Sequence, residues 1–205
     1  MGCCFDHCND LNLLIDIMTS GGNQRKGMLI TNKETVDSIL SPFHKTSLAD
    51  LHIVSAGNEK KLDKFRIKIV PTKNREASIG FKIITSKFTL GYTGDTGYYA
   101  DMAKHYSDCD ILIVNNTFPF NKKQKDSMNS DTTVALLSKI KPSLVILQHF
   151  GPAMLDVNPL YEARMIQKKT GVQVIAARDG LLIEPASYAA EAKQKNLMGF
   201  RSGKQ

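Results

Sequence analysis

The 205-residue chain lacks the features that mark three common classes of protein: a membrane span, a secretion signal and a disulfide framework. No apolar run reaches the length that crosses a bilayer. Residues 1–10 lack the basic region followed by an apolar segment that begins a signal peptide. The four cysteines are few and uneven, with three of them in the first eight residues, which does not indicate a disulfide framework. We therefore expect a cytoplasmic protein.

The chain also lacks internal repeats and any linker long enough to separate two domains. Its length and its 42% content of hydrophobic residues suit one domain with a sizeable core. The last twenty or so residues are polar and end in a basic stretch. We expect one domain over residues 1–184 and a loosely held polar tail over residues 185–205.

Charge favours a partner that carries negative charge. Lysine and arginine number 27 against 20 acidic residues, so the net charge is +7 and the pI is about 9.2. The basic residues are dispersed, however, and most read as solvated loops or helix ends. Aromatic and basic residues do not interleave, so a nucleic-acid-binding module is the weaker of the possible interpretations.

Apolar spacing predicts an α/β protein in which strand and helix alternate along the second half of the chain. Strands are expected at residues 27–31, 51–55, 65–70, 79–85, 88–92, 110–115 and 144–147. Helices are expected at residues 11–18, 33–40, 98–105, 131–140 and 159–170, with Asn9 or Asp10, Asn32, and Ser130 or Asp131 as caps for three of them. Residues 172–177 and 181–184 are expected to pair as a hairpin around Asp179-Gly180.

Residues 90–97, Leu-Gly-Tyr-Thr-Gly-Asp-Thr-Gly, place one carboxylate among three glycines just after a predicted strand. Asp95 fits two interpretations. It can cap the helix that follows, since Asp and Gly are common turn residues. It can also serve as a ligand or base, because a rigid strand end positions a side chain well.

Two other places in the chain favour the second interpretation. Asp6-His7 lies in a segment dense in potential metal ligands, and His149 follows the predicted strand at 144–147. Ligands gather at strand ends in α/β sheets, and Asp and His are side chains that zinc prefers. The residues alone therefore favour a metal centre at Asp6, His7, Asp95 and His149.

These motifs give the chain a resemblance to the metallo-β-lactamase-fold hydrolases, nearest to the ribonuclease Z and cyclic phosphodiesterase subgroup. The resemblance rests on Asp6-His7 and the helix after it, on the Gly94-Asp95-Thr96 step, on the His149-Phe150 step and on the segment around Asp179-Gly180. It implies an α/β, four-layer αββα sandwich, here lacking its opening strands. The incomplete half-sheet should expose apolar surface near residues 11–18 and 65–70 and favour a homo-oligomer.

The resemblance also assigns metal ligands. The family's His-x-His-x-Asp-His motif falls on Gly2, Cys4, Asp6 and His7, and a third histidine position falls on Asn74. One metal position therefore loses its three histidines. The other keeps Asp6, His7 and His149, with Asp95 as the shared carboxylate, and Cys4 could substitute as a soft ligand. We expect one Zn²⁺ rather than two, with Mn²⁺ as an alternative, and Asp6 as the residue that orients water or acts as base.

The implied activity is metal-dependent hydrolysis of a phosphodiester, either a small molecule or RNA, with metal-activated water as the nucleophile. The first alternative is a catalytically degenerate, non-enzymatic family member, because three ligands and the opening strands are missing. The second is the basic nucleic-acid-binding module. No membrane partner is expected.

Overall fold

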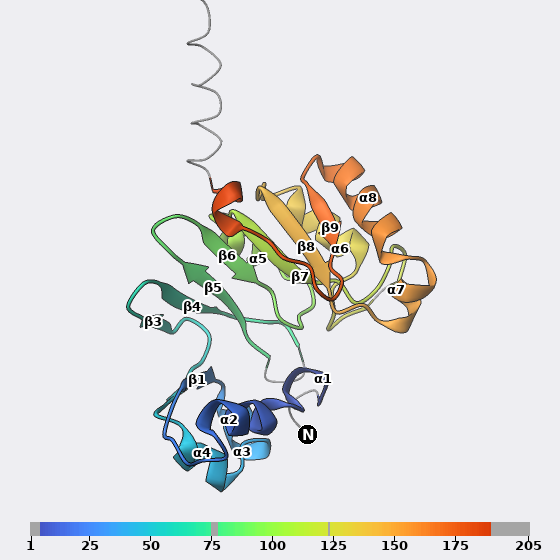
Figure 1. The fold of residues 1–205 in the computed structure, drawn as a ribbon. Coiled ribbons are helices and arrows are strands. Elements are labelled where there is room, and N and C mark those ends of the chain that lie inside the picture. Colours follow the sequence, from blue (N-terminus) through green and yellow to red (C-terminus); the bar gives the residue numbers. More distant parts are fainter. Residues whose placement is uncertain (1–4, 75–77, 123, 190–205) are drawn as a thin grey trace, which may run out of the picture.

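The computed structural model describes residues 5–74, 78–122 and 124–189, and of residues 5 and 6 it describes the backbone alone. Gly2, Cys4 and most of the expected tail lie outside these residues. The helices are α1 (Phe5–Cys8), α2 (Leu11–Thr19), α3 (Lys33–Ser38), α4 (Pro42–Ser47), α5 (Met102–Tyr106), α6 (Ser130–Leu137), α7 (Pro152–Asp156), α8 (Pro159–Thr170) and the 3₁₀ turn η1 (Pro185–Tyr188). The strands are β1 (Met28–Thr31), β2 (Asp50–Ile53), β3 (Glu59–Lys61), β4 (Arg66–Val70), β5 (Gly80–Ile84), β6 (Thr89–Tyr92), β7 (Ile111–Asn115), β8 (Leu144–Gln148) and β9 (Val174–Ala176). Figure 1 shows their arrangement.

A mixed seven-stranded sheet forms the centre of the molecule, in the order β3-β4-β5-β6-β7-β8-β9. Strands β3 to β6 pair antiparallel, and β6 to β9 pair parallel. Strand β6 thus belongs to both halves. Because β6, β7 and β8 run parallel, the residues that follow them emerge at the same edge of the sheet.

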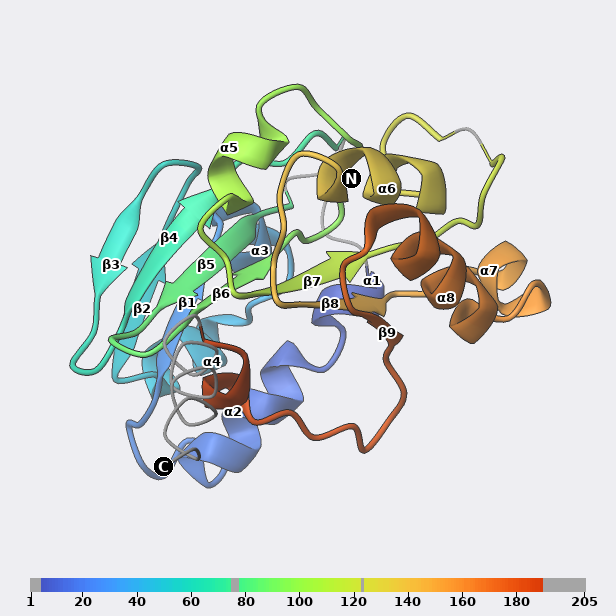
Figure 2. The same ribbon diagram turned by 90° about the horizontal axis from the view of Figure 1, so that it is seen from above.

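The strands β1 and β2 form a separate parallel pair that faces the larger sheet. Helices α2, α3 and α4 lie outside this pair, while α5, α6 and α8 cover the opposite face of the seven-stranded sheet (Figures 1 and 2). The order of layers is therefore helix, two-stranded sheet, seven-stranded sheet, helix. This confirms the predicted α/β sandwich, and in the described residues its second sheet has two strands.

The core is built on both faces of the parallel strands. In β7, Leu112 and Val114 pack against the helices, whereas Ile111 and Ile113 belong to the cluster on the other face. This explains the nearly continuous apolar run that predicted a buried strand. A smaller cluster holds the N-terminal lobe together, with Ile15 of α2 against Leu40 and Leu48. No helix in the described part of the chain combines the length and the hydropathy that crossing a bilayer requires.

The expected hairpin around Asp179-Gly180 is wrong. The turn is present, with Leu181 N donating to the carbonyl of Arg178, but β9 pairs only with β8, in parallel. The segment after the turn crosses the sheet face instead of returning along its edge, and Ile183 and Tyr188 pack onto the β7–β8 surface. The Asp-Gly pair fixed a turn, and side-chain burial across the sheet then outweighed strand pairing.

Several helix boundaries also differ from the predictions. Asn32 caps α3 as expected, its side chain accepting from Thr35 N. The cap of α6 is Asn129 rather than Ser130 or Asp131, in a reciprocal box with Thr132. The helix expected over residues 98–105 is shorter and begins at Met102.

Candidate metal centre

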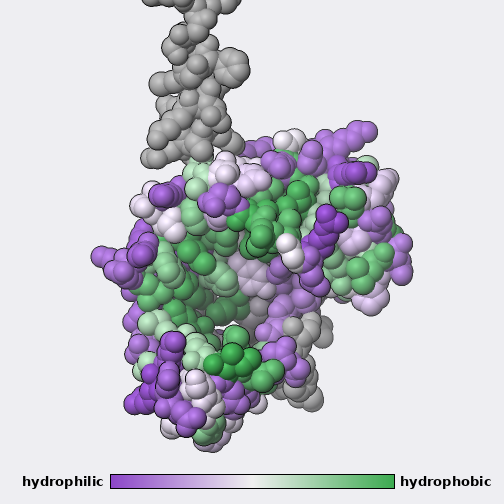
Figure 3. Space-filling view, in the orientation of Figure 1, coloured by the Kyte–Doolittle hydropathy of each residue, from purple (hydrophilic) through white to green (hydrophobic). Residues whose placement is uncertain are grey.

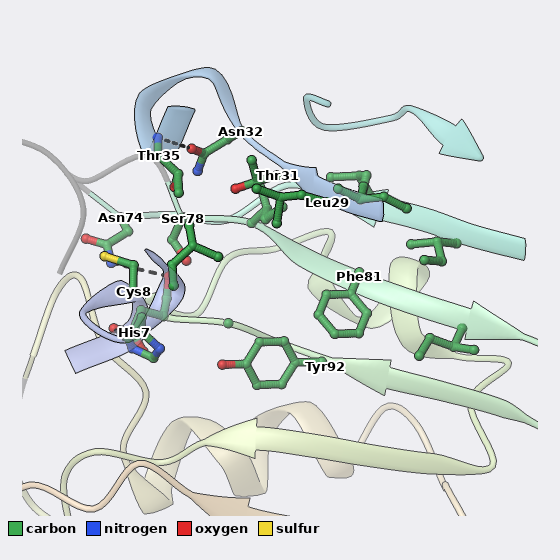
Figure 4. Close-up of a pocket in the computed structure, with 18 residues that line it drawn as sticks. His7, Cys8, Leu29, Thr31, Asn32, Thr35, Asn74, Ser78, Phe81 and Tyr92 are labelled. Atoms are coloured by element: carbon green, nitrogen blue, oxygen red, sulfur yellow. Dashed lines mark hydrogen bonds and ion pairs between the residues drawn. The ribbon is translucent and has the colours of Figure 1, made fainter. Parts of the chain in front are cut away.

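The candidate centre lies where β6 and β8 end. Asp95 follows β6 by three residues, and His149 directly follows β8. His7 comes from α1, in the N-terminal lobe, and reaches the same edge of the sheet (Figure 4). Asp6 precedes His7 on α1, and its side chain lies outside the described residues. The structure thus brings together three of the four predicted ligands.

The three side chains are in direct contact. His7 Nε2 donates to Asp95 Oδ2 at 2.8 Å, and His149 Nδ1 lies 3.7 Å from Asp95 Oδ1. The two imidazole rings stack at 4.6 Å between their centroids. One potential ligand atom from each residue falls within 4.8 Å of the others, and in the described part of the chain this is the one such group of three or more. The atoms converge on a single small volume.

Asp95 is held as a carboxylate. Burial raises its pKa, but hydrogen bonds from His7 and Asn115 and the nearby charge of His149 outweigh that effect and lower it below the usual value. A deprotonated oxygen is the form that binds a cation. The other interpretation of Asp95, as the cap of the following helix, is wrong, because the N-cap residue of α5 is Asp101.

Buried polar side chains fix the carboxylate in place. Asn115, which ends β7 and is 1% exposed, donates to Asp95 Oδ1 at 2.7 Å and to the Tyr92 hydroxyl at 3.2 Å. Gln148, its register partner at the end of β8, donates to Asn115 Oδ1. Sequence reasoning missed Asn115, although a polar residue closing a buried strand beside two predicted site strands was a usable signal.

Local backbone geometry explains the glycines around Asp95. Gly94 has φ +62°, and an added Cβ there would lie 2.5 Å from the carbonyl oxygen of Ile79. Thr93 and Thr96 are buried on either side, and their hydroxyls accept from the backbone N–H groups of Asn115 and Lys73. The turn is thereby tied to the end of β7 and to the loop after β4, which fixes the position of Asp95 at the site.

His149 has a left-handed backbone, φ +59°, which is uncommon for a residue with a side chain. That conformation turns the imidazole toward Asp95 directly at the end of β8. The Thr117 hydroxyl lies 3.3 Å from His149 Nδ1 and helps to orient the ring. Strained backbone of this kind clusters at functional sites.

Asn74 gives no support to the second metal position that the family resemblance implies. Its amide donates to the backbone carbonyl of Asp95 at 3.3 Å, so it serves the turn that carries the carboxylate. Gly2 and Cys4 lie outside the described residues. Cys8 is disulfide-bonded, so it offers no thiolate to an ion.

The residues present fit a single zinc ion. Two ligands that each lie at the usual zinc distance in a tetrahedral site are about 3.3 Å apart. The two imidazole nitrogens lie 2.8 and 3.7 Å from different oxygens of the Asp95 carboxylate, and one potential ligand atom from each of the three residues lies within 4.8 Å of the others, which is near that spacing. Two imidazoles and a carboxylate are also the donor types that zinc accepts, and three protein ligands leave a position for water.

Comparison with known proteins gives the same fold. A protein of Methanocaldococcus jannaschii, MJ1374, is 29% identical over 188 residues, which cover 87% of this chain and 70% of that protein. The metallo-beta-lactamase fold protein YhfI of Bacillus subtilis superposes with a TM-score of 0.73 at 17% identity, over 86% of this chain and 72% of that one. Human tRNase Z, short form, gives a TM-score of 0.59 at 15% identity, over 84% and 73% of the two chains.

A family model described as the beta-lactamase superfamily domain matches residues 5–150, a stretch that contains His7, Asp95 and His149. The match covers the two-stranded sheet and the larger sheet as far as the end of β8. Together with the sandwich and the convergent ligands at its edge, it shows that the chain belongs to the beta-lactamase superfamily, in the metallo-β-lactamase fold of metal-dependent hydrolases.

Proposed function

We propose that the chain is a hydrolase of phosphodiesters that works with one zinc ion held by His7, Asp95 and His149, with Asp6 beside the ion as the base that activates water. The observation that carries the proposal is the convergence of His7, Asp95 and His149 within 4.8 Å at the edge of the sheet. Mn²⁺ is the alternative ion, since carboxylate and imidazole also accept it.

A bound zinc supplies a Lewis acid and lowers the pKa of a coordinated water toward neutrality. The remaining roles belong to the chain. Asp6 takes the proton of the attacking water, and the oxygen forms its bond to phosphorus as the bond from phosphorus to the leaving oxygen breaks. The leaving oxygen keeps the bonding electron pair and takes up the proton from Asp6. Asn115 keeps the Asp95 carboxylate in place throughout through its 2.7 Å hydrogen bond.

Charge and fold support a phosphodiester as substrate. The chain carries a net charge of +7, which attracts anionic substrates. Human tRNase Z, which by its name acts on tRNA, shares the fold. Because Asn74 and the other second-position residues are not histidines, little stabilises a poor leaving group. Activated esters such as bis(p-nitrophenyl) phosphate should therefore be hydrolysed best.

Metal content and turnover test the proposal together. Purified protein should retain at most one equivalent of zinc after dialysis, and Asp95→Asn should lose both the zinc and the turnover of the nitrophenyl ester. Asp63→Asn, at an exposed carboxylate outside the site, is the matched control and should retain both. Two tightly held equivalents, or turnover that survives Asp95→Asn, would contradict the proposal.

A second candidate, a non-catalytic family member, is favoured by one observation. Asn74 uses its amide to hold the backbone of Asp95, so a position expected to bind metal has a structural role. On this view the protein binds one ion without turnover. Zinc retention combined with no hydrolysis of several activated esters above buffer selects this candidate over the enzyme.

A further inference from the structure

A cavity of about 460 Å³ lies between the two sheets and reaches the candidate metal centre. We call it the chamber. Its walls are mostly apolar, and its principal apolar residues are Leu11, Leu29, Ile67, Ile69, Phe81 and Ile83. Figure 3 shows hydrophobic surface around the hollow between the N-terminal lobe and the seven-stranded sheet.

Strand register explains how the wall on the larger sheet is built. Ile67 of β4 lies opposite Ile83 of β5, and Ile69 lies opposite Phe81, so the four side chains share one face. Phe81 in turn lies opposite Tyr92 of β6, with 5.1 Å between the ring centroids. The facing wall comes from Leu29 and Ile30 of β1. Within the described residues the facing sheet has two strands, and they leave this stretch of the larger sheet without a full cover.

The chamber is continuous with the metal centre. His7 and Asp95 line it, and Tyr92 connects the two regions. The Tyr92 ring forms part of the wall beside Phe81, while its hydroxyl accepts from Asn115, which also donates to Asp95. Figure 4 shows Tyr92 between Phe81 and His7. A molecule in the chamber would therefore have its apolar part against β4 and β5 and its polar end at the three ligands.

The size and lining suit a small molecule. Ligand pockets commonly measure about 300–1,000 Å³ and combine apolar walls with a few polar groups at one end. Apolar cavities tend to stay dry and to accept apolar guests, because unfilled space forfeits contacts along its whole lining. The charged lining residues, His7 and Asp95, belong to the metal centre, whereas the wall formed by β4 and β5 is apolar.

We propose that the chamber binds an aromatic or branched aliphatic group of the substrate, whose phosphodiester lies at His7, Asp95 and His149. This inference rests on the proposed function and specifies its substrate class. Substrates in which one ester group is bulky and apolar should bind better than those with a methyl group in the same place.

The first test measures binding without turnover. The probe is 1-anilinonaphthalene-8-sulfonate, an apolar ring system with one anionic group. Ile83→Trp fills the chamber from β5, whereas Ile84→Trp adds the same bulk on the opposite face of the same strand. We expect at least a tenfold loss of probe affinity in Ile83→Trp and little change in Ile84→Trp. Leu14→Gln removes an exposed apolar side chain of α2. Any loss of probe affinity in this variant measures nonspecific binding of the probe to the surface.

The second test measures turnover of p-nitrophenyl phosphodiesters whose other group is methyl, phenyl or naphthyl. We expect KM to fall at least tenfold from methyl to naphthyl in the parent protein and in Ile84→Trp. In Ile83→Trp the difference in KM between the methyl and naphthyl esters should disappear, whereas Ile84→Trp should keep the parent kcat for the methyl ester.

The two tests separate failure of the inference from failure of the proposed function. Turnover with the same KM for all three esters, and probe affinity unaffected by Ile83→Trp, overturns the chamber as a substrate site while hydrolysis stands. Probe affinity lost in Ile83→Trp without any turnover in the parent protein overturns the hydrolase and leaves an apolar ligand site. A change in oligomeric state in Ile83→Trp, with unchanged probe affinity, would overturn the inference. It would indicate that a protein segment from another copy, and not a substrate group, occupies the chamber.

Discussion

At the scale of single residues, Asn115 determines how firmly Asp95 is held. Asn115→Ala removes the hydrogen bond to Asp95. It also removes one hydrogen-bond partner from each of Gln148 and Tyr92. Loss of such an orienting partner should lower zinc affinity about 10–100-fold. The free energy of unfolding should fall by about 1–3 kcal/mol.

Asn116 provides the matched control for this prediction. It is also fully buried, and it bonds to Ser130 and Thr133, away from Asp95. Asn116→Ala should cost a similar amount of stability and leave zinc affinity unchanged in competition with a chelator. Equal losses of zinc affinity in the two variants would show that general loosening, not the bond to Asp95, is responsible.

Cys109 should be chemically inert in the folded protein. Burial, together with the charge of Asp108, raises the pKa of its thiol to about 12. At pH 8 roughly one thiol in ten thousand is then ionised, and the thiolate is the reactive form. Alkylation of Cys109, followed by mass spectrometry of its peptide, should be very slow at pH 8. It should accelerate about tenfold for each pH unit until the pH approaches 12.

Denaturant provides the control for this prediction. Unfolding exposes the thiol and returns its pKa to the ordinary range, so Cys109 should then react at the rate of a free cysteine. Rapid alkylation at pH 8 in the native protein would show that the connection between α5 and β7, where Cys109 lies, opens readily.

At the scale of elements, the turn after β6 depends on the missing side chain of Gly94. Gly94→Ala must accommodate both φ +62° and a contact of 2.5 Å with the Ile79 carbonyl. Gly180→Ala faces a similar backbone cost at φ +82° with nothing within 4 Å of its Cβ. The backbone cost alone is about 1–2 kcal/mol. We expect that loss of unfolding free energy for Gly180→Ala and a distinctly larger one for Gly94→Ala.

Zinc binding distinguishes the two glycine variants further. Only Gly94→Ala shifts the residue next to Asp95, so only that variant should also bind zinc more weakly. Chemical denaturation with and without zinc measures both effects. Similar stability in the two variants would mean that the Ile79 backbone yields easily.

Elements with a clear apolar period could be predicted from the sequence, and those fixed by tertiary contacts could not. The buried strand β7 and the helix α8 follow their patterns. The short elements α4, α7 and β3 were missed, because three to six residues carry too little periodicity. The cap of α6 was predicted at Ser130 or Asp131, one or two residues late, since Asn129, Ser130 and Asp131 are all good cap residues.

Some residues of the candidate site could likewise be predicted from the sequence, and others could not. Asp95 and His149 could be predicted from residue type and strand-end position, and His7, which lies on α1, from its residue type in a segment dense in potential ligands. The hydrogen bonds of Asn115 and Asn74 depend on the register of β7 with its neighbours and on the path of the loop after β4. No local pattern specifies either. The position of the Asp6 side chain stays a prediction.

At the scale of the whole molecule, apolar surface remains exposed where the second sheet is narrow. The expected surface on residues 11–18 is present: Leu13, Leu14 and Ile17 of α2 are 59%, 62% and 71% exposed. The expectation for residues 65–70 is wrong in part. Ile69 and Val70 are buried, because this strand forms the chamber wall on one face and packs into the main core on the other.

We predict that α2 mediates self-association. A contiguous apolar patch of this kind usually finds a partner. Sedimentation equilibrium should show a dimer whose dissociation constant rises at least tenfold when Leu14 and Ile17 are both changed to lysine. Leu155 and Leu160, exposed on α7 and α8, offer a matched pair of apolar sites for the same double change. If that control weakens the dimer equally, the interface lies elsewhere or is nonspecific.

The contact between His7 and Asp95 joins residues 88 positions apart in the chain. Closing a loop of that length costs about 4 kcal/mol of chain entropy beyond the constant term. The loop encloses the whole N-terminal lobe and strands β3 to β6. The three ligands therefore come together only after this lobe has docked onto the sheet. During refolding, uptake of a spectroscopically visible ion such as Co²⁺ should lag behind the return of helical circular dichroism, so the ion would report the last long-range step of folding.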